Sequence, residues 1–190
     1  MKKLTLRVCF LALGFCLSGL VVSAQEIVHA LAGTVTAVDS ARKTITVTTD
    51  DGSEGIFKDA TGSDRSIEFS KIIRAETTPA ADFKASGMRA IVFYYGMGSQ
   101  RIVVAMRSLG AGPFERTTGS LVSFNRGTHT LTIQKPSGEK ETFHIDAQSI
   151  AETSTGAAEG DKLDASSGDK LRVTSAIVNG VKTALFIAPA

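Results

Sequence analysis

One sequence pattern occurs twice in this chain, and the repeat constrains the fold more than any other feature. The segment Gly33-Thr-Val35-Thr-Ala-Val38 returns 86 residues later as Gly119-Ser-Leu121-Val-Ser-Phe124. The same offset carries Ile45 onto Leu131, Gly52 onto Gly138 and Phe57 onto Phe143. Several matches in one order predict a tandem duplication of a single module.

The match continues beyond these residues with different offsets. Ala75-Glu76-Thr77-Thr78 corresponds to Ala151-Glu152-Thr153-Ser154 with an offset of 76, so the first copy holds ten extra residues before this point. Ala85-Ser86-Gly87 then corresponds to Ser166-Ser167-Gly168.

Apolar residues alternate with threonines in both copies. Ile45 and Val47 do so in the first copy, and Leu131 and Ile133 do so in the second. A period of two is typical of a strand with one buried face. Asp50-Asp51-Gly52 then predicts a tight turn, because aspartate and glycine accept the positive φ that such turns require.

Each copy ends in a predicted hairpin. Residues 89–95 turn at Gly96-Met97-Gly98 and return over 101–106, and residues 171–178 turn at Asn179-Gly180 and return over 183–187. Asparagine followed by glycine is a strong signal for a two-residue turn. The stretches around Ile91 and Ile102 are apolar almost throughout, as expected where a barrel interior meets a second packed surface.

Each copy therefore consists of three strands, a short crossing and two further strands. The crossings, residues 80–86 and 157–164, are long enough for one helical turn each. This order predicts an all-β chain of two tandem, small, five-stranded OB-like barrels, with an SH3-like barrel or a small sandwich as alternatives. The expected modules are residues 25–107 and 119–190, joined by a polar, glycine-containing linker over 108–118.

The first 24 residues have the parts of a secretion signal. Lys2, Lys3 and Arg7 precede an apolar stretch over residues 8–22, and small residues follow as far as Ala24. Glycine and serine interrupt this stretch, which is too short to span a membrane well. We predict a signal peptide over 1–24, cleaved after Ala24, and export to the periplasm or the medium. An uncleaved anchor is the alternative.

Cleavage changes the composition that matters for function. Cys9 and Cys16 leave with the signal, so the exported residues 25–190 have no thiol for disulfides, nucleophilic catalysis or metal binding. These 166 residues carry 18 basic and 19 acidic side chains, a net charge of −1. A nucleic-acid-binding surface is normally basic, so we expect no nucleic-acid partner.

Two stretches resemble the repeating domains of unknown function found in exported bacterial proteins. One is the Gly-x-Val-x-x-Val opening at Gly33, and the other runs from Leu163 through Gly168-Asp169-Lys-Leu-Arg-Val173. The resemblance covers nearly all of the exported chain and implies OB-like barrels. Its motifs are structural, so it implies no catalytic residues. The first copy departs from it, with Met88-Arg89 at the place of Asp169-Lys170.

The sequence offers little that resembles a catalytic or metal site. No Gly-x-Ser-x-Gly nucleophile motif occurs. His144 and Asp146, two residues apart, would share one face of a strand and are a possible base with its orienting carboxylate. A polar outer face is the simpler explanation, because the first copy has Lys58 and Ala60 there. We therefore expect a protein that is not an enzyme.

The histidines do not show the spacing of a metal centre. His29 lies near the new N-terminus and His129 lies in a turn, so both are expected at the surface. If the first hairpin is centred on Met97, Met88 and Met106 become cross-strand neighbours and their thioethers could hold Cu(I). Methionines that fill gaps in the core are the simpler explanation. We expect no catalytic, cofactor or metal residues and no cofactor.

Tyr94 and Tyr95 complete the set of candidate residues. Successive strand residues face opposite sides, so one tyrosine should point away from the core and contact a peptide, a glycan or the other module. The leading hypothesis is a non-enzymatic ligand- or partner-binding module of the cell envelope, whose partner is an envelope protein, a glycan or a small ligand. A periplasmic copper-binding or carrier protein is the alternative, and an enzyme with a site between the barrels is a third hypothesis.

Overall fold

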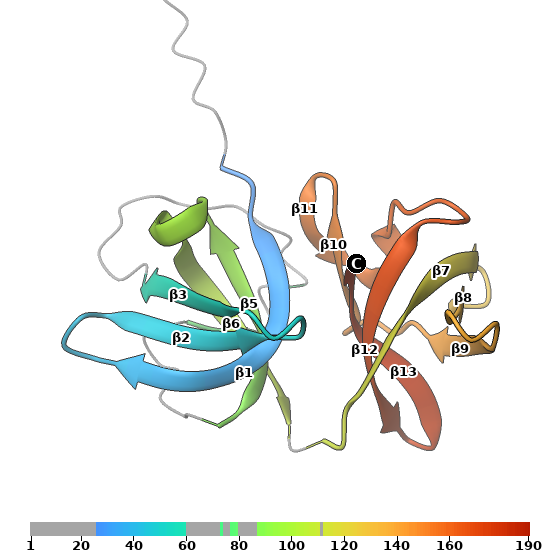
Figure 1. Cartoon of the computed structure of the whole chain (residues 1–190), viewed down its shortest axis with the longest axis horizontal. Helices are drawn as coiled ribbons and strands as arrows, with labels where there is room; N and C mark the ends of the chain where they lie inside the picture. The colour runs from blue at the N-terminus through green and yellow to red at the C-terminus, as the bar shows by residue number, and fades with distance from the viewer. Residues whose placement is uncertain (1–25, 60–72, 74–76, 80–86, 111) are drawn as a thin grey trace, which may run out of the picture.

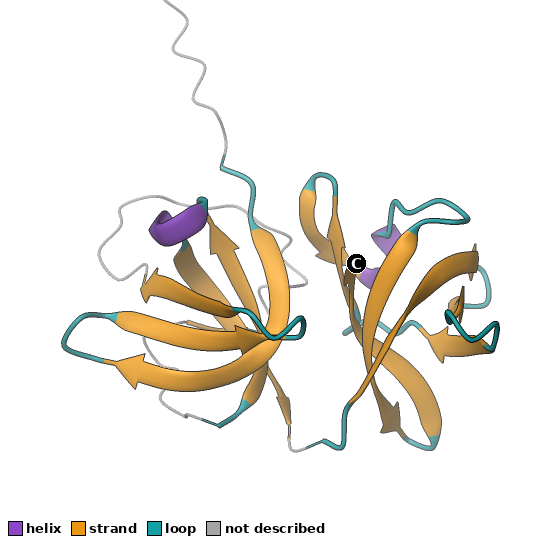
Figure 2. Cartoon of the chain, viewed as in Figure 1, coloured by secondary structure: helices purple, strands orange, loops and turns teal. Residues whose placement is uncertain are grey.

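The described part of the protein is built almost entirely from strands. The computed structural model describes residues 26–59, 73, 77–79, 87–110 and 112–190, and these form one six-stranded and one seven-stranded sheet (Figures 1 and 2). The all-β prediction is confirmed. The predicted signal peptide, Cys9, Cys16 and the crossing over 80–86 lie outside the described residues.

The first sheet closes on itself through a parallel strand pair. Its strands are β1 (His29–Asp39), β2 (Thr44–Thr49), β3 (Glu54–Asp59), β4 (Thr78–Pro79), β5 (Arg89–Tyr95) and β6 (Ile102–Gly110), with the short 3-10 helix η2 (Gly98–Gln100) between the last two. They lie in the order β3-β2-β1-β5-β6-β4. Lys58 of β3 pairs with Ile102 of β6, and this contact joins the two sides of the sheet.

The second sheet repeats this plan. Its elements are β7 (Glu115–Asn125), β8 (Thr130–Gln134), β9 (Lys140–His144), β10 (Ile150–Thr153), β11 (Gly156–Glu159), the 3-10 helix η3 (Gly160–Lys162), β12 (Lys170–Val178) and β13 (Val181–Pro189). Their order is β11-β10-β13-β12-β7-β8-β9. The parallel pair of His144 in β9 with Thr183 in β13 closes it.

Backbone hydrogen bonds coincide at the positions that match in sequence. The Gly87 N–H donates to the Val35 carbonyl at 2.7 Å, and the Gly168 N–H donates to the Leu121 carbonyl at 2.8 Å. A β-bulge follows Val35 in the first sheet and Leu121 in the second. The sequence repeat therefore corresponds to a repeat in backbone pairing.

Each sheet encloses an apolar core, and a third apolar cluster lies between the two sheets. Ile91 and Phe93 of β5 pack in this third cluster with Ile150 of β10 and Phe186 of β13. Val92, which points to the other side of β5, lies in the core of the first sheet. The apolar stretch around Ile91 is thus packed on both faces, as the sequence indicated.

Strands continue into the segment interpreted as a linker over 108–118. β6 extends to Gly110 because Ser108 and Gly110 pair with β5, and β7 begins at Glu115 because its first residues pair with β12. Residues 157–164, expected to form a helical turn, contain most of β11 and the helix η3. Among the described residues, no helix has both the length and the apolar character needed to cross a membrane.

Candidate functional site

The two methionines considered for copper are not cross-strand neighbours. Met106 pairs with Val92 and is fully buried, and Met88 packs at the edge of the same core. The hairpin turns over more residues than expected, since Tyr95 pairs with Ile102, and this moves the register. The expectation that Met88 faces Met106 is therefore wrong, and both side chains take part in core packing.

One tyrosine was expected to point away from the core, and the structure places both in packed surroundings, with Tyr94 only partly buried. Tyr95 is 3 % exposed. Tyr94 packs against the core of the first sheet, with its ring 5.2 Å from that of Phe57 and 5.8 Å from that of His29. Burial raises the pKa of the Tyr94 hydroxyl, and the nearby Glu152 carboxylate adds to this shift. Tyr95 is therefore buried, and Tyr94 is a half-buried residue at the edge of the first core.

The side chain of His29 is 37 % exposed, and it reaches across to the second sheet. Its Nδ1 is 2.6 Å from Oε1 of Glu152 in β10, and Oε2 of Glu152 accepts the backbone N–H of Ala30 at 2.7 Å. Burial raises the pKa of Glu152, although its hydrogen bonds with His29 and Ala30 oppose the shift. One carboxylate thus holds the start of β1 against the second sheet.

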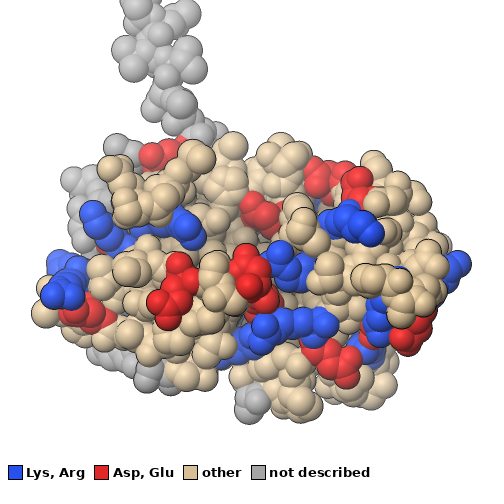
Figure 3. Space-filling model, in the orientation of Figure 1, with Lys and Arg blue, Asp and Glu red and all other residues tan. Residues whose placement is uncertain are grey.

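A second contact between the sheets is centred on Asp50, at the turn between β2 and β3. Its carboxylate is 4 % exposed and pairs with Arg89 of β5, and it accepts a hydrogen bond from the Thr174 hydroxyl of β12. Arg116 of β7 donates to the Asp50 carbonyl at 3.1 Å. Acidic and basic side chains lie next to one another where the two halves meet (Figure 3). The contacts of Asp50 with Thr174 and Arg116 therefore connect the two halves of the protein.

The candidate site is a cavity of about 550 Å³ in the second sheet, where β9 ends and β11 leads into η3. One side carries His129, His144 and Ile145. The carbonyl of His129 accepts the N–H of Ile145 at 2.8 Å, which fixes the turn between β7 and β8 against the end of β9. This bond sets the spacing between the residues on this side of the cavity.

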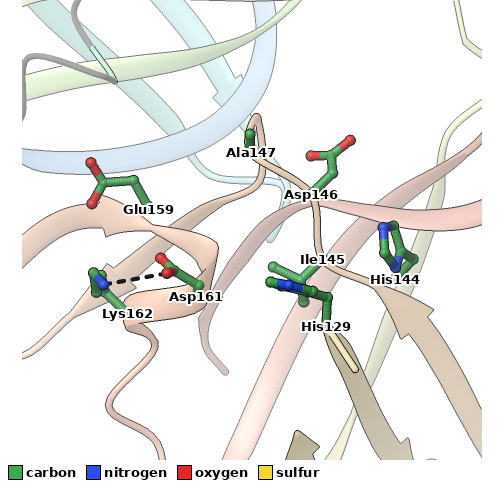
Figure 4. A pocket seen from close by; sticks show the side chains of 8 residues that line it. All are labelled: His129, His144, Ile145, Asp146, Ala147, Glu159, Asp161 and Lys162. Carbon is green, nitrogen blue, oxygen red and sulfur yellow. Dashed lines mark hydrogen bonds and ion pairs between the residues drawn. The ribbon is translucent and has the colours of Figure 1, made fainter. Parts of the chain in front are cut away.

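The opposite side of the cavity is formed by Glu159, Asp161 and Lys162. Arg126 holds this segment, since its guanidinium donates to the backbone carbonyls of Asp161 and Leu163 at 3.0 and 2.9 Å. In Figure 4, the His129 and Ile145 side chains point toward the side on which Asp161 and Lys162 lie. The cavity therefore has an imidazole and apolar wall facing a charged one.

His144 and Asp146 both line the cavity, but they do not form the expected pair. Oδ1 of Asp146 accepts the backbone N–H groups of Gln148 and Ser149, each at 2.9 Å, and so caps the turn that follows β9. The neighbouring ring of His144 is that of His129, with 6.4 Å between the centroids. Across the part of the chain that the structure describes, no three His, Cys, Asp or Glu side chains are arranged to hold a metal ion.

The first copy has different side chains at the matching positions. Lys43 occupies the place of His129, and both have a left-handed backbone, with φ of 54° and 52°. Lys58 occupies the place of His144. The backbone frame is thus shared, whereas the histidines belong to the second copy alone.

Sequence reasoning did not bring Glu159, Asp161 and Lys162 together as one wall of a cavity. One signal pointed to it, because the offset between the copies rises from 76 at Ser154 to 81 at Gly168. The second copy therefore holds five extra residues in the segment that contains β11 and η3.

No protein-family model matches the chain, and a search of curated proteins finds no match. Its function must be inferred from its own geometry.

Proposed function

We propose that each closed sheet is an OB-like barrel. In the first sheet the pairings run β1-β2-β3-β6-β5 and return to β1, with only β3 and β6 parallel. In the second sheet β7, β8, β9, β13 and β12 follow the same circuit. A five-stranded Greek-key arrangement of this kind supports the OB assignment over an SH3-like barrel or a sandwich.

We propose further that the protein is an exported, non-enzymatic module of the cell envelope that binds a ligand in the cavity of the second barrel. The position of the cavity carries this proposal. It lies beside the turn between the barrel's first two strands, where His129 is found, and at the end of the third strand, where His144 is found. OB-fold proteins bind their ligands over this loop and the neighbouring strands.

The side-chain geometry favours binding over catalysis. Asp146 caps its own turn, so it does not orient His144 as a base. The volume of the cavity falls within the range of small-molecule sites. The copper-carrier alternative has lost its main support, because the partner of Met106 is Val92.

A ligand screen against a matched pair of variants tests the proposal. The exported chain is screened by ligand-observed NMR with small cations, neutral sugars and carboxylic acids. The double variant His129→Lys/His144→Lys gives the second copy the side chains of the first. The double variant Gln134→Lys/Ser137→Lys adds two lysines at exposed positions toward the other end of β8 and serves as the control.

We expect binding that the first variant removes and the control retains. Failure of every compound to bind, or binding that survives His129→Lys/His144→Lys, contradicts the proposed site. Turnover of any compound contradicts the non-enzymatic role.

A further inference from the structure

The charges around the cavity are unevenly distributed. Asp146, Glu159 and Asp161 contribute three carboxylates, and Lys162 contributes one ammonium group. The ion pair of Lys162 with Asp161 has an N–O distance of 3.3 Å and is well exposed. Exposed pairs of this kind hold their partners only weakly. A ligand cation can therefore compete with Lys162 for Asp161.

Arg126, a further cation that contacts this segment, is already bound to backbone carbonyls. Arg126 donates to the carbonyls of Asp161 and Leu163, and its guanidinium lies 4.9 Å from the centre of the Phe124 ring. It supports η3 in this position. The η3 side of the cavity therefore presents mainly negative charge to a ligand.

The other wall suits a flat group with an apolar stem. His129 offers an imidazole ring, and the exposed Ala147 adds an aliphatic surface to the lining, whereas Ile145 is only 1 % exposed (Figure 4). A guanidinium group is planar, stacks on rings and donates hydrogen bonds in a fork that matches a carboxylate. Its aliphatic stem can lie along apolar surface.

We infer that the cavity takes a guanidinium group carried on a short aliphatic stem, as in an arginine side chain or a small alkylguanidine. This inference rests on the proposed function and names its ligand class. The guanidinium lies between the His129 ring and the carboxylate of Asp161, and the stem lies along the apolar lining at Ala147. The same acidic wall disfavours a phosphate-bearing ligand.

Three probes with the same butyl stem and different end groups test the ligand class. Butylguanidinium, butylurea and pentanoate are titrated into the exported chain by calorimetry at low and at moderate salt. We expect butylguanidinium to bind at least about tenfold more tightly than butylurea, with affinity that falls as salt rises, and pentanoate to bind least. Asp161→Asn should remove most of this preference, whereas Glu139→Gln, at an exposed carboxylate in the second sheet, should retain it.

The outcomes separate this inference from the proposed function. Equal or tighter binding of butylurea or pentanoate overturns the inference and leaves a ligand site in place. A preference for butylguanidinium that Asp161→Asn leaves unchanged also overturns it. Absence of binding by all three probes, together with a negative ligand screen, contradicts both proposals.

Discussion

Asp50 lies in a turn, but its surroundings are those of a buried residue. It follows β2 in an exposed loop sequence, yet its carboxylate is buried against Arg89 and Thr174. The matching residue of the second copy is Pro136, which has no charge. Removing one partner of a buried ion pair destabilises a protein strongly, because the other charge is left buried without a partner.

Replacing Asp50 by alanine should therefore destabilise the protein strongly. Asp50→Ala leaves the Arg89 guanidinium, whose side chain is 9 % exposed, without its carboxylate partner. We expect a loss of about 3–5 kcal/mol in the free energy of unfolding, measured by urea titration. Glu139→Gln, which alters an exposed ion pair with Lys135, should cost about 0–1 kcal/mol. Equal effects of the two changes would show that Asp50 is not buried in an ion pair.

Glu152 should make the contact between the sheets sensitive to pH. Its pKa is raised by burial, so the folded state holds a proton above the ordinary pKa of 4.5 where the unfolded chain has lost it. The contribution of Glu152 to stability therefore falls as pH rises from 4.5 through the raised pKa. Glu152→Gln should be at least as stable as the parent at neutral pH.

Urea unfolding across a pH series checks this prediction. The stabilities of the Glu152→Gln variant and the parent should converge below the ordinary pKa of glutamate and separate above it. A variant that becomes progressively less stable than the parent as pH rises would contradict the role of burial.

At the scale of elements, strand alternation and turn chemistry predicted most of the fold. The threonine-rich strands and the Asn179-Gly180 turn lie where the sequence placed them, and both turn residues have positive φ. The register of β5 with β6 was missed because the turn runs from Gly96 to Arg101. An error in the centre of a turn displaces every pair of a hairpin, which is why Met88 was placed opposite Met106.

The sequence pointed to residues on only one side of the cavity. His144 and Asp146 were identified as candidates, whereas Glu159 and Lys162 were interpreted only as part of a short crossing. Local periodicity could not find β10 and β11, since each has four residues. Their position also depends on the pairing of β10 with β13, which is distant in sequence.

The close approach of β7 to β8 gives a prediction about these elements. A Cβ atom at Gly119 would lie 2.3 Å from the Gln134 carbonyl oxygen, and one at the matching Gly33 would lie 2.5 Å from that of Thr48. Gly119→Ala should force the strands apart and cost about 1–3 kcal/mol.

Thermal unfolding with a second alanine variant provides the control. At Gly127 the nearest atom to a Cβ is Oδ1 of Asn125 at 3.4 Å, so Gly127→Ala should change stability by only about 0.5 kcal/mol. A Gly119→Ala variant as stable as Gly127→Ala would contradict the observed register.

At the scale of the whole molecule, the first copy supports the site of the second. Arg107 of β6 donates to the carbonyl of Gln148 at 2.6 Å. This carbonyl lies in the turn between β9 and β10 that also carries Asp146 and Ala147, two residues of the cavity. Asp50 and Glu152 hold the same two halves together elsewhere.

Removing the Arg107 contact should loosen the cavity from a distance. Arg107→Met keeps the stem but loses the donor, and hydrogen bonds from charged groups contribute about 1.5–3 kcal/mol. We expect faster hydrogen exchange at the Ser149 amide and weaker binding of butylguanidinium, with the strand amides of β8 unaffected. Unchanged exchange at Ser149 would show that the turn holds its shape without the first copy.

The central claim is that the two copies share a frame and that only the second carries a ligand site. Backbone NMR of residues 25–190, titrated with butylguanidinium, tests it most directly because each copy serves as the control for the other. We predict shifts confined to residues around His129, His144 and Asp161. Equal shifts around Lys43 and Lys58, or shifts spread along the contact between the sheets, would contradict the claim.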